Sequence, residues 1–371
     1  MRKFNIKTQI HKLYTLTMVG YFRIAGASWV ALLALRGFSL LEIGVLESIF
    51  HIVSSSFEIP SGVAADVFGR KRTMVLASLV SLVSGLLMIW SYNFATVAFA
   101  IGFSALSYNL ESGTREALAY DSLKFAGREE EYNKFASTEM MLYRITSSTA
   151  TLCAGFALWL GYRRAYLLDI FFSIIAIGIA CSLKEVSAAE LGNADKDDHG
   201  TANAGIRCRL KNVITESWQF MITNKRARGI MVINALIGAV STLVLFFLQA
   251  KLPLAGLKDA LLGPALFVMG LGAALGAKVV GYFPGWKYGK YIMISGAGVI
   301  FAFAMIFTGK PYLMDLGGFI GSFSDDFLEV RTDIILNEMI PSEQRATLIS
   351  VNSFMFSLIM IVMSTLMGSV M

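Results

Sequence analysis

The stretch GVAADVFGRKR, Gly62 to Arg72, separates two long apolar segments and carries one acid followed by three consecutive cations. Asp66 would fall at the C-terminal end of a preceding helix, where the helix dipole disfavours an anion. Arg70, Lys71 and Arg72 would fall at the start of a following helix, where the dipole disfavours cations. Helix propensity therefore does not explain these charges, and their reason must lie elsewhere in the chain.

The composition indicates a membrane protein. The chain has 371 residues, of which 56% are hydrophobic and 16% charged, whereas a soluble protein carries about 25% charged residues. Many segments exceed the ~20 apolar residues that a helix needs to cross a bilayer. A membrane barrel would show short alternating strands instead, so the predicted fold class is an all-α polytopic membrane protein. The basic start MRKFNIKTQIHK precedes an apolar run too long for a signal peptide, which predicts a retained first span.

Hydropathy and helix breakers predict eleven spans and divide the chain in two. A polar segment, 184–227, separates an N-terminal six-helix bundle, 1–183, from a C-terminal five-helix bundle, 228–371. We interpret it as a cytoplasmic linker that ends in an amphipathic helix, with Leu210, Val213, Ile214, Trp218 and Met221 on one face. The predicted spans are 13–35, 39–61, 73–91, 94–123, 134–160, 164–183, 228–250, 259–283, 289–309, 311–339 and 343–369.

The distribution of cations predicts the orientation. The segments that would face the cytoplasm with the N-terminus inside carry more than three times as many Lys and Arg residues as the opposite turns. This bias predicts a cytoplasmic N-terminus in a cell membrane. The net charge of +6 is then a signal of topology and not of nucleic-acid binding.

The two halves repeat one another. SYNLESGTREALAYDSL lies in the fourth span of the first half, and SFSDDFLEVRTDIILNEMIP lies in the fourth span of the second. Arg115 aligns with Arg331 when these segments are superposed. Internal repeats of this kind are typical of secondary transporters.

The turn quoted first also carries a family resemblance. Gly62, Asp66, Gly69, Arg70 and Lys71 match the pattern G-x-x-x-D-x-x-G-R-[RK], so the chain resembles the major facilitator superfamily. The stretches EIP (58–60), SGTREALAYDSL (112–123) and PSEQRAT (341–347) look like a bacterial drug-efflux-like branch of that family. The resemblance implies a major-facilitator-like fold, in which two pseudo-symmetric helical bundles rock about a central site by alternating access.

Within this resemblance the charged turn is expected to serve a cytoplasmic gate. Gly62 would let the second and eleventh spans approach closely. Asp66 would be satisfied by the start of the eleventh span near Ser342 and by Arg70 or Arg345 when that side is closed. The alternative is a purely topological turn. The predicted gate residues are Gly62, Asp66, Gly69, Arg70, Lys71 and Arg345.

The chain departs from the family pattern in three places. The fifth span, with SSTATLCAGFALWLG, lacks the glycine-proline pair of the efflux branch. The fourth span lacks an early arginine that many relatives carry. A twelfth helix is expected to be missing, either naturally or through truncation of the gene product.

Ionisable residues inside the spans are the candidate functional groups, because a charge at the bilayer centre costs about 3 kcal/mol or more. Ser322, Asp326, Glu329 and Asp333 share one helical face, which suits a proton relay or a cationic substrate group. The alternatives are a structural network with Arg331, Arg115 or Arg23, or a segment that does not span. The predicted substrate or proton pathway comprises Asp326, Glu329, Asp325, Glu111, Arg115 and Arg23. The charges predicted to be structural are Glu58, Glu116, Asp121, Arg144 and Arg331.

These patterns together predict a secondary active transporter, with proton-coupled export of small amphipathic compounds or drugs as the first hypothesis. A proton-coupled nutrient symporter and a truncated, transport-inactive protein are the alternatives. The expected partners are a small-molecule substrate, protons or cations, and the lipid bilayer, with the protein a monomer. The sequence has no Walker-type loop, nucleophile–base pair or metal-ligand spacing, so no enzymatic activity, cofactor or metal is expected. Cys153, Cys181 and Cys208 indicate no disulfide framework.

Overall fold

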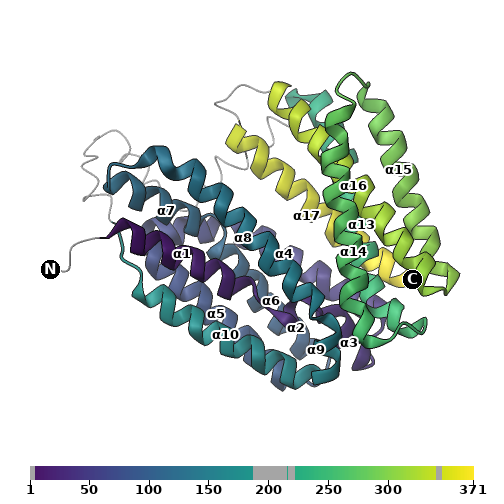
Figure 1. The fold of residues 1–371 in the computed structure, drawn as a ribbon, viewed down its shortest axis with the longest axis horizontal. Helices are drawn as coiled ribbons and strands as arrows, with labels where there is room; N and C mark the ends of the chain where they lie inside the picture. The colour runs from purple at the N-terminus through teal and green to yellow at the C-terminus, as the bar shows by residue number, and fades with distance from the viewer. Residues whose placement is uncertain (1–4, 187–214, 216–221, 340–344) are drawn as a thin grey trace. The chain divides into compact units, whose positions relative to one another are not determined.

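A computed structural model of the chain describes residues 5–186, 215, 222–339 and 345–371. The described residues form helices joined by short turns, with no strand among them (Figure 1). The predicted amphipathic helix of the linker falls outside the described residues, apart from Thr215.

Each predicted span corresponds to one helix or to a set of consecutive helices. In the first half these are α1 (Ile6–Tyr21), α2 (Ile24–Ala27) and α3 (Trp29–Leu35), α4 (Leu40–Phe68), α5 (Arg70–Trp90), α6 (Phe94–Glu111) and α7 (Thr114–Phe125), α8 (Tyr132–Leu152) and α9 (Ala154–Leu160), and α10 (Tyr162–Ser182). In the second half they are α13 (Lys225–Leu254), α14 (Asp259–Val279), α15 (Tyr288–Met305), α16 (Pro311–Met339) and α17 (Arg345–Val370). The helical fold class predicted from hydropathy is confirmed.

Seven of the described helices are long and apolar enough to cross a membrane by themselves: α4, α5, α10, α13, α14 with its short extension, α15 with its extension, and α17. The other spans have a physical reason for falling short of that criterion. The first, fourth and fifth are interrupted, and α16 carries acidic side chains along an otherwise apolar helix.

Two local features differ from the sequence-based prediction. The turn predicted over 62–72 shrinks to Gly69, because α4 continues through Pro60 to Phe68 and α5 begins at Arg70. The fourth span is not one helix over 94–123. It breaks at Gly113, whose φ of 74° is a left-handed conformation that glycine adopts without steric cost.

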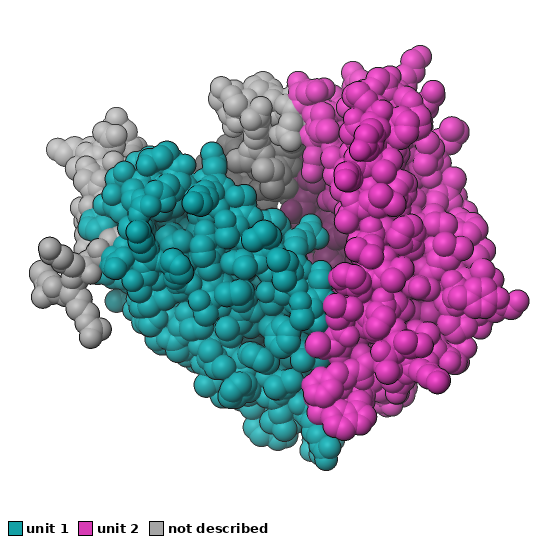
Figure 2. Space-filling model, viewed as in Figure 1, with its two compact units in different colours: residues 1–27, 53–150, 163–210 teal, residues 28–52, 151–162, 211–371 magenta. Residues whose placement is uncertain are grey.

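By contacts, the chain forms two compact units (Figure 2). Unit 1 comprises residues 1–27, 53–150 and 163–210, and unit 2 comprises residues 28–52, 151–162 and 211–371. The units follow contacts and not chain order, so the predicted bundles 1–183 and 228–371 stay a prediction.

Each unit has apolar cores of its own. In unit 1, Leu13, Leu118, Phe135 and Ala180 pack together from α1, α7, α8 and α10. In unit 2, Tyr291 is fully buried beside Val299, Phe327 and Leu328. Since lipid tails are as apolar as these side chains, close packing holds such helices together more than burial from water does.

Glycines bring α16 close to its neighbours on two sides. A Cβ added to Gly272 or Gly276 of α14 would overlap the carbonyl oxygen of Phe319 or Phe323 of α16. A Cβ on Gly298 of α15 would overlap the hydroxyl of Ser324. The backbone of α16 therefore lies directly against α14, and the acidic side chains of α16 extend from a helix that its neighbours hold tightly.

Two further helix pairs in unit 2 cross with glycine on both partners. A Cβ on Gly44 of α4 would overlap the Ser364 carbonyl of α17, and one on Gly368 would overlap the Leu40 carbonyl. The end of α8 and the start of α9 contact α14 in the same way, with Gly155 of α9 against the Asp259 carbonyl and Gly263 of α14 against the Leu152 carbonyl of α8. At the other end of α4, a Cβ on Gly62 would meet no described atom within 4 Å. The close approach expected of Gly62 stays a prediction.

The packing of α14 on α16 predicts the effect of a single methyl group. Gly276→Ala should lower the free energy of unfolding by about 1–3 kcal/mol, because overpacking forces the backbones apart. Gly270→Ala in the same helix is the matched control, since no described atom lies within 4 Å of its added Cβ and alanine favours helix. Thermal unfolding of both variants in detergent measures the difference, and equal midpoints would contradict the packing described.

Candidate functional site

The break in the fourth span places a helix start inside the membrane region. Ser112 ends α6, Gly113 turns the chain, and α7 begins at Thr114. The first backbone N–H groups of a helix have no partner within it, and its dipole favours negative charge there. Arg115 lies in this first turn, so a cation occupies a position that the helix disfavours and must be balanced from elsewhere.

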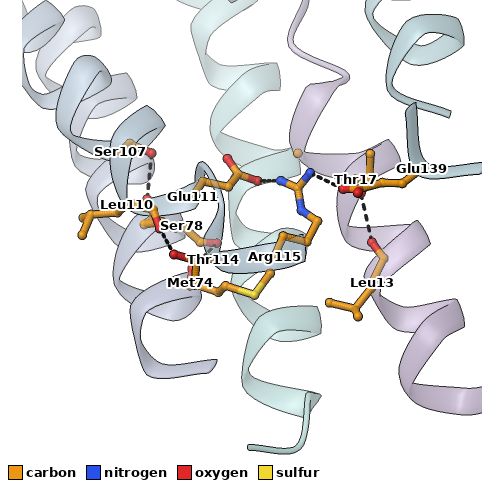
Figure 3. A network of polar contacts seen from close by, with 12 residues as sticks. Leu13, Thr17, Met74, Ser78, Ser107, Leu110, Glu111, Thr114, Arg115 and Glu139 are labelled. Carbon is orange, nitrogen blue, oxygen red and sulfur yellow. Dashed lines mark hydrogen bonds and ion pairs between the residues drawn. The ribbon is translucent and has the colours of Figure 1, made fainter. Parts of the chain in front are cut away.

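Two carboxylates and an aromatic ring balance Arg115, which is 3% exposed. One terminal nitrogen donates to Glu139 Oε1 of α8 at 2.8 Å, and the other pairs with Glu111 one turn back. The Thr17 hydroxyl of α1 donates to the same Glu139 oxygen at 3.2 Å. The guanidinium lies 5.2 Å from the Tyr21 ring centroid, within the range of a cation–π contact. Figure 3 shows Arg115 between the two carboxylates.

This cluster, which we call the Arg115 network, joins three spans of unit 1. Taking a guanidinium and carboxylates out of water is repaid only when the charges remain paired. The network therefore makes the arrangement of α1, α7 and α8 depend on polar contacts as well as on packing. Glu116, the next residue of α7, has one buried carboxylate oxygen with no hydrogen bond to any described residue.

The first span also breaks, and an acid that the sequence analysis overlooked covers the break. Asp169 of α10 is 7% exposed; its two oxygens accept from the backbone nitrogens of Ala25 at 3.2 Å and Gly26 at 2.9 Å. Arg23, whose Nε donates to the Gly20 carbonyl at 2.7 Å, attracts the same carboxylate electrostatically. The sequence feature that could have identified Asp169 is its position as an isolated acid within the apolar segment 164–183.

A small polar cavity lies between the Arg115 network and the break in the first span. Its volume of about 10 Å³ suffices for roughly one water molecule. The Ser81 hydroxyl on its wall is buried and has no hydrogen-bond partner among the described residues. The polar lining comes from Arg23, Ser78, Ser81, Ser107, Glu111 and Ser173. Arg23, Glu111 and Arg115, predicted as one pathway, are thus brought together.

Among the predicted gate residues, Gly69, Arg70 and Lys71 contact a second overlooked acid, Glu185. Glu185, just after α10, accepts from the backbone nitrogens of Arg70 at 2.9 Å and Lys71 at 3.0 Å. Gly69 has a φ of 95°, and a Cβ there would lie 2.8 Å from a Glu185 oxygen. The Arg70 side chain pairs with Asp121 of α7. Glu185 and Asp121 therefore balance the positive charge at the start of α5, for which helix propensity gave no reason.

The α16 acids occupy different environments. Asp325 lies toward α13, because a Cβ on Gly238 would be 3.1 Å from its Oδ1. Asp326 is half-buried, whereas Glu329 is exposed, and both carboxylates repel that of Asp325. Exposure changes along the face predicted for Ser322, Asp326, Glu329 and Asp333. Ser322 is buried, at 3% exposed, whereas Asp333 at the other end is exposed.

The remaining predicted residues are dispersed. Arg331 donates to the Pro284 carbonyl at 3.3 Å and lies over the Tyr291 ring. Arg144 is exposed beside the Tyr143 ring, and Glu58 is exposed. The side chains of Asp66 and Arg345 lie outside the described part of the chain, so their predicted contact stays a prediction. Within the described ranges, no group of three or more His, Cys, Asp or Glu residues could hold a metal ion.

The comparisons with known proteins agree on the family. The model of the major facilitator superfamily matches residues 13–365. An uncharacterized MFS-type transporter of Bacillus subtilis (strain 168), YxaM, is 21% identical over 330 residues, covering 88% of this chain and 79% of the relative. The chain belongs to the major facilitator superfamily and is a multi-pass membrane protein with the fold of secondary transporters.

Solved structures share this fold at low sequence identity. The nucleoside transporter NupG superposes with a TM-score of 0.72 at 16% identity, over 97% of this chain and 90% of that one. A bacterial homologue of the human lysosomal transporter Spinster gives 0.68 at 13% identity, over 97% and 81%. The peptide transporter POT in complex with sulfate gives 0.67 at 12% identity, over 98% and 92%.

The Arg115 network predicts a large effect of one neutralised acid. Glu139→Gln should cost about 3–5 kcal/mol of stability, because it removes a partner from a buried guanidinium. Glu131→Gln is the control, since its pair with Arg128 is 34% and 38% exposed and such surface pairs contribute about 0–1 kcal/mol. Unfolding midpoints in detergent compare them, and similar losses would show that the network contributes little.

The conformation of Gly69 predicts a second pair of variants. Gly69→Ala should lose about 1–3 kcal/mol, because glycine alone readily adopts this positive φ with an extended ψ and the added Cβ would lie 2.8 Å from a Glu185 oxygen. Gly62→Ala is the matched control in the same motif, since no described atom lies within 4 Å of its added Cβ. Thermal unfolding distinguishes the two, and a stability loss confined to Gly62→Ala would refute the role given to Glu185.

Proposed function

We propose that this transporter couples the movement of small amphipathic compounds to protons, and that it exports them. The observation that supports the proposal is the group of acids on α16: Asp325, Asp326 and Glu329 lie within five residues of one another on a helix packed tightly against α14 and α15. Acids inside membrane spans are costly and mark ion or substrate pathways by default.

The proposed mechanism uses the mutual repulsion of these acids. Three carboxylates so close together favour binding of protons or of a cationic group, which relieves the repulsion. Proton binding would neutralise the substrate site, and proton release would restore its charge. Because a ligand shifts a conformational equilibrium only by its differential affinity for the two states, this change of charge would bias alternating access.

The proposal includes an orientation and a gate. The excess of Lys and Arg supports a cytoplasmic N-terminus in the cell membrane. The motif Gly62–Lys71 would then lie on the cytoplasmic side, with Asp66 and Arg345 as the contact that forms on closure. The ends of α4 and α17 that cross at Gly44 and Gly368 would lie on the outer side.

Import of a nutrient is the second candidate, and the substrates in the names of two structural neighbours, a nucleoside and a peptide transporter, suggest which nutrients to test. The similar folds described above belong to a nucleoside transporter, a peptide transporter and a bacterial homologue of Spinster, and none of these three is named as a drug exporter. Purified protein in liposomes with an imposed pH gradient separates the candidates. Uptake of uridine or dialanine with an inward proton gradient would support symport, and proton-driven expulsion of ethidium would support export. A protein that moves none of these probes would refute both substrate classes.

Neutralising the α16 acids should alter the pH dependence of transport. With the probe that the wild type moves, Asp326→Asn or Glu329→Gln should reduce gradient-driven accumulation about tenfold or more, while exchange across the membrane without a gradient persists. Glu338→Gln is the matched control, an exposed acid near the end of the same helix, and should leave accumulation unchanged. If both substitutions leave the pH profile as in the wild type, these acids do not carry the coupling.

A further inference from the structure

A basic and aromatic turn joins α14 to α15 within unit 2. The chain from 278 to 290 reads KVVGYFPGWKYGK, with three lysines, four aromatic residues and no acid. Both helices, with their short extensions, are long and apolar enough to cross a membrane. The turn that joins them therefore lies at a membrane surface, where tryptophan, tyrosine and lysine side chains contact lipid headgroups.

Contacts from α15 and α16 fix the shape of this turn. The Tyr291 hydroxyl of α15 donates to the Phe283 carbonyl, and the Arg331 guanidinium of α16 donates to the Pro284 carbonyl at 3.3 Å. Trp286 stacks on Phe283, with ring centroids 4.2 Å apart. A surface whose shape is already fixed loses little conformational entropy when a ligand binds to it.

Cations from two helices lie over neighbouring rings of the turn. Lys290 Nζ is 5.5 Å from the centroid of the Trp286 ring, and Arg331 Cζ is 5.6 Å from that of the Tyr291 ring. The two ring centroids are 5.9 Å apart. Lys287, which is exposed and follows Trp286 in the chain, adds a third cation. Positive charge from α15, α16 and the turn therefore gathers at one place.

Arg331 has hydrogen-bond donors to spare. Its Nε is buried without an acceptor among the described residues, and no ion pair joins it to a described carboxylate. The nearest acids along α16, Glu329 and Asp333, are two residues away on either side and so project about 200° around the helix from it. The bond to Pro284 is exposed, so the terminal nitrogens reach the surface. A guanidinium placed in this way suits a phosphate group, which it can bind through two N–H groups at once.

The surface around these cations is open and continues into an apolar one. A Cβ built on Gly281, Gly285 or Gly289 would meet no described atom within 4 Å, so a headgroup can approach the turn closely. Further along α15, Met293 and Ile300 are 67% and 72% exposed. An occupant with a phosphate at one end and apolar chains at the other matches both parts of this surface, whereas a free phosphate ion would match only the first.

We propose that Arg331, Lys287 and Lys290, together with the ring of Trp286, bind the headgroup of an anionic phospholipid. A zwitterionic lipid fits less well, because its own positive group would meet three cations with no described acid among them. In the proposed orientation this surface lies in the cytoplasmic leaflet, whose anionic lipids attract basic segments. The bound lipid joins α15 to α16 at the membrane surface, and its binding depends on neither the substrate nor the direction of transport.

Native mass spectrometry of the full chain in detergent tests the proposal, with phosphatidylglycerol and phosphatidylcholine of the same acyl chains as probes. Phosphatidylglycerol should bind at least about tenfold more tightly. Lys287→Gln and Lys290→Gln should each weaken its binding about fivefold, since a cation near a membrane surface contributes about 1 kcal/mol. Lys258→Gln is the matched control, an exposed lysine at the opposite end of α14, and should leave the affinity unchanged.

A second pair of variants separates charge from packing at the turn itself. Gly285→Glu should weaken phosphatidylglycerol binding more than Gly285→Gln does, because the two side chains differ only in charge and neither meets a described atom within 4 Å of its Cβ. Equal affinities for the two lipids, or equal binding by Gly285→Glu and Gly285→Gln, would overturn the proposal. So would displacement of phosphatidylglycerol by inorganic phosphate, since the site would then bind the ion and not the lipid.

Discussion

A guanidinium group held inside a membrane protein must keep its anionic partners, and in unit 1 that constraint organises the surrounding helices. Arg115 begins α7 at a position unsuited to a cation, so Glu111 and Glu139 are needed from α6 and α8. Thr17 then ties α1 to the same carboxylate.

The same principle operates at the other interruptions. Where the chain stops being helical inside apolar surroundings, its backbone N–H groups need acceptors. Asp169 supplies them at Ala25 and Gly26, and Glu185 supplies them at Arg70 and Lys71. Each acid comes from α10 or its end, so one helix stabilises both the break in the first span and the turn between α4 and α5. Charges that have no partner nearby in the sequence, such as those at the start of α5, have one in the folded chain.

The sequence predicted the spans well because hydropathy and short turns are local signals. The motif Gly62–Lys71 was also local, and it identified the family that the comparisons show. The partners of its cations were not predictable, since Asp121 and Glu185 are about 50 and 115 residues away along the chain. The break at Gly113 was missed because a single glycine inside an apolar run is compatible with a continuous helix. Likewise, Glu139 gave no sign of pairing with Arg115, which lies in a different span.

The single residue between α4 and α5 has a mechanical consequence. α4 has 29 residues and α5 has 21, and Gly69 alone separates them. One residue allows little independent movement, so α4 can tilt relative to α5 only if the backbone dihedral angles of Gly69 change. Otherwise the two helices move together. Gly69 is fixed against Glu185, which restricts that rotation. At 1.5 Å per residue, the two helices have a total contour length of about 75 Å, and any change in the angle between them is therefore made at Gly69 or by bending within one of them.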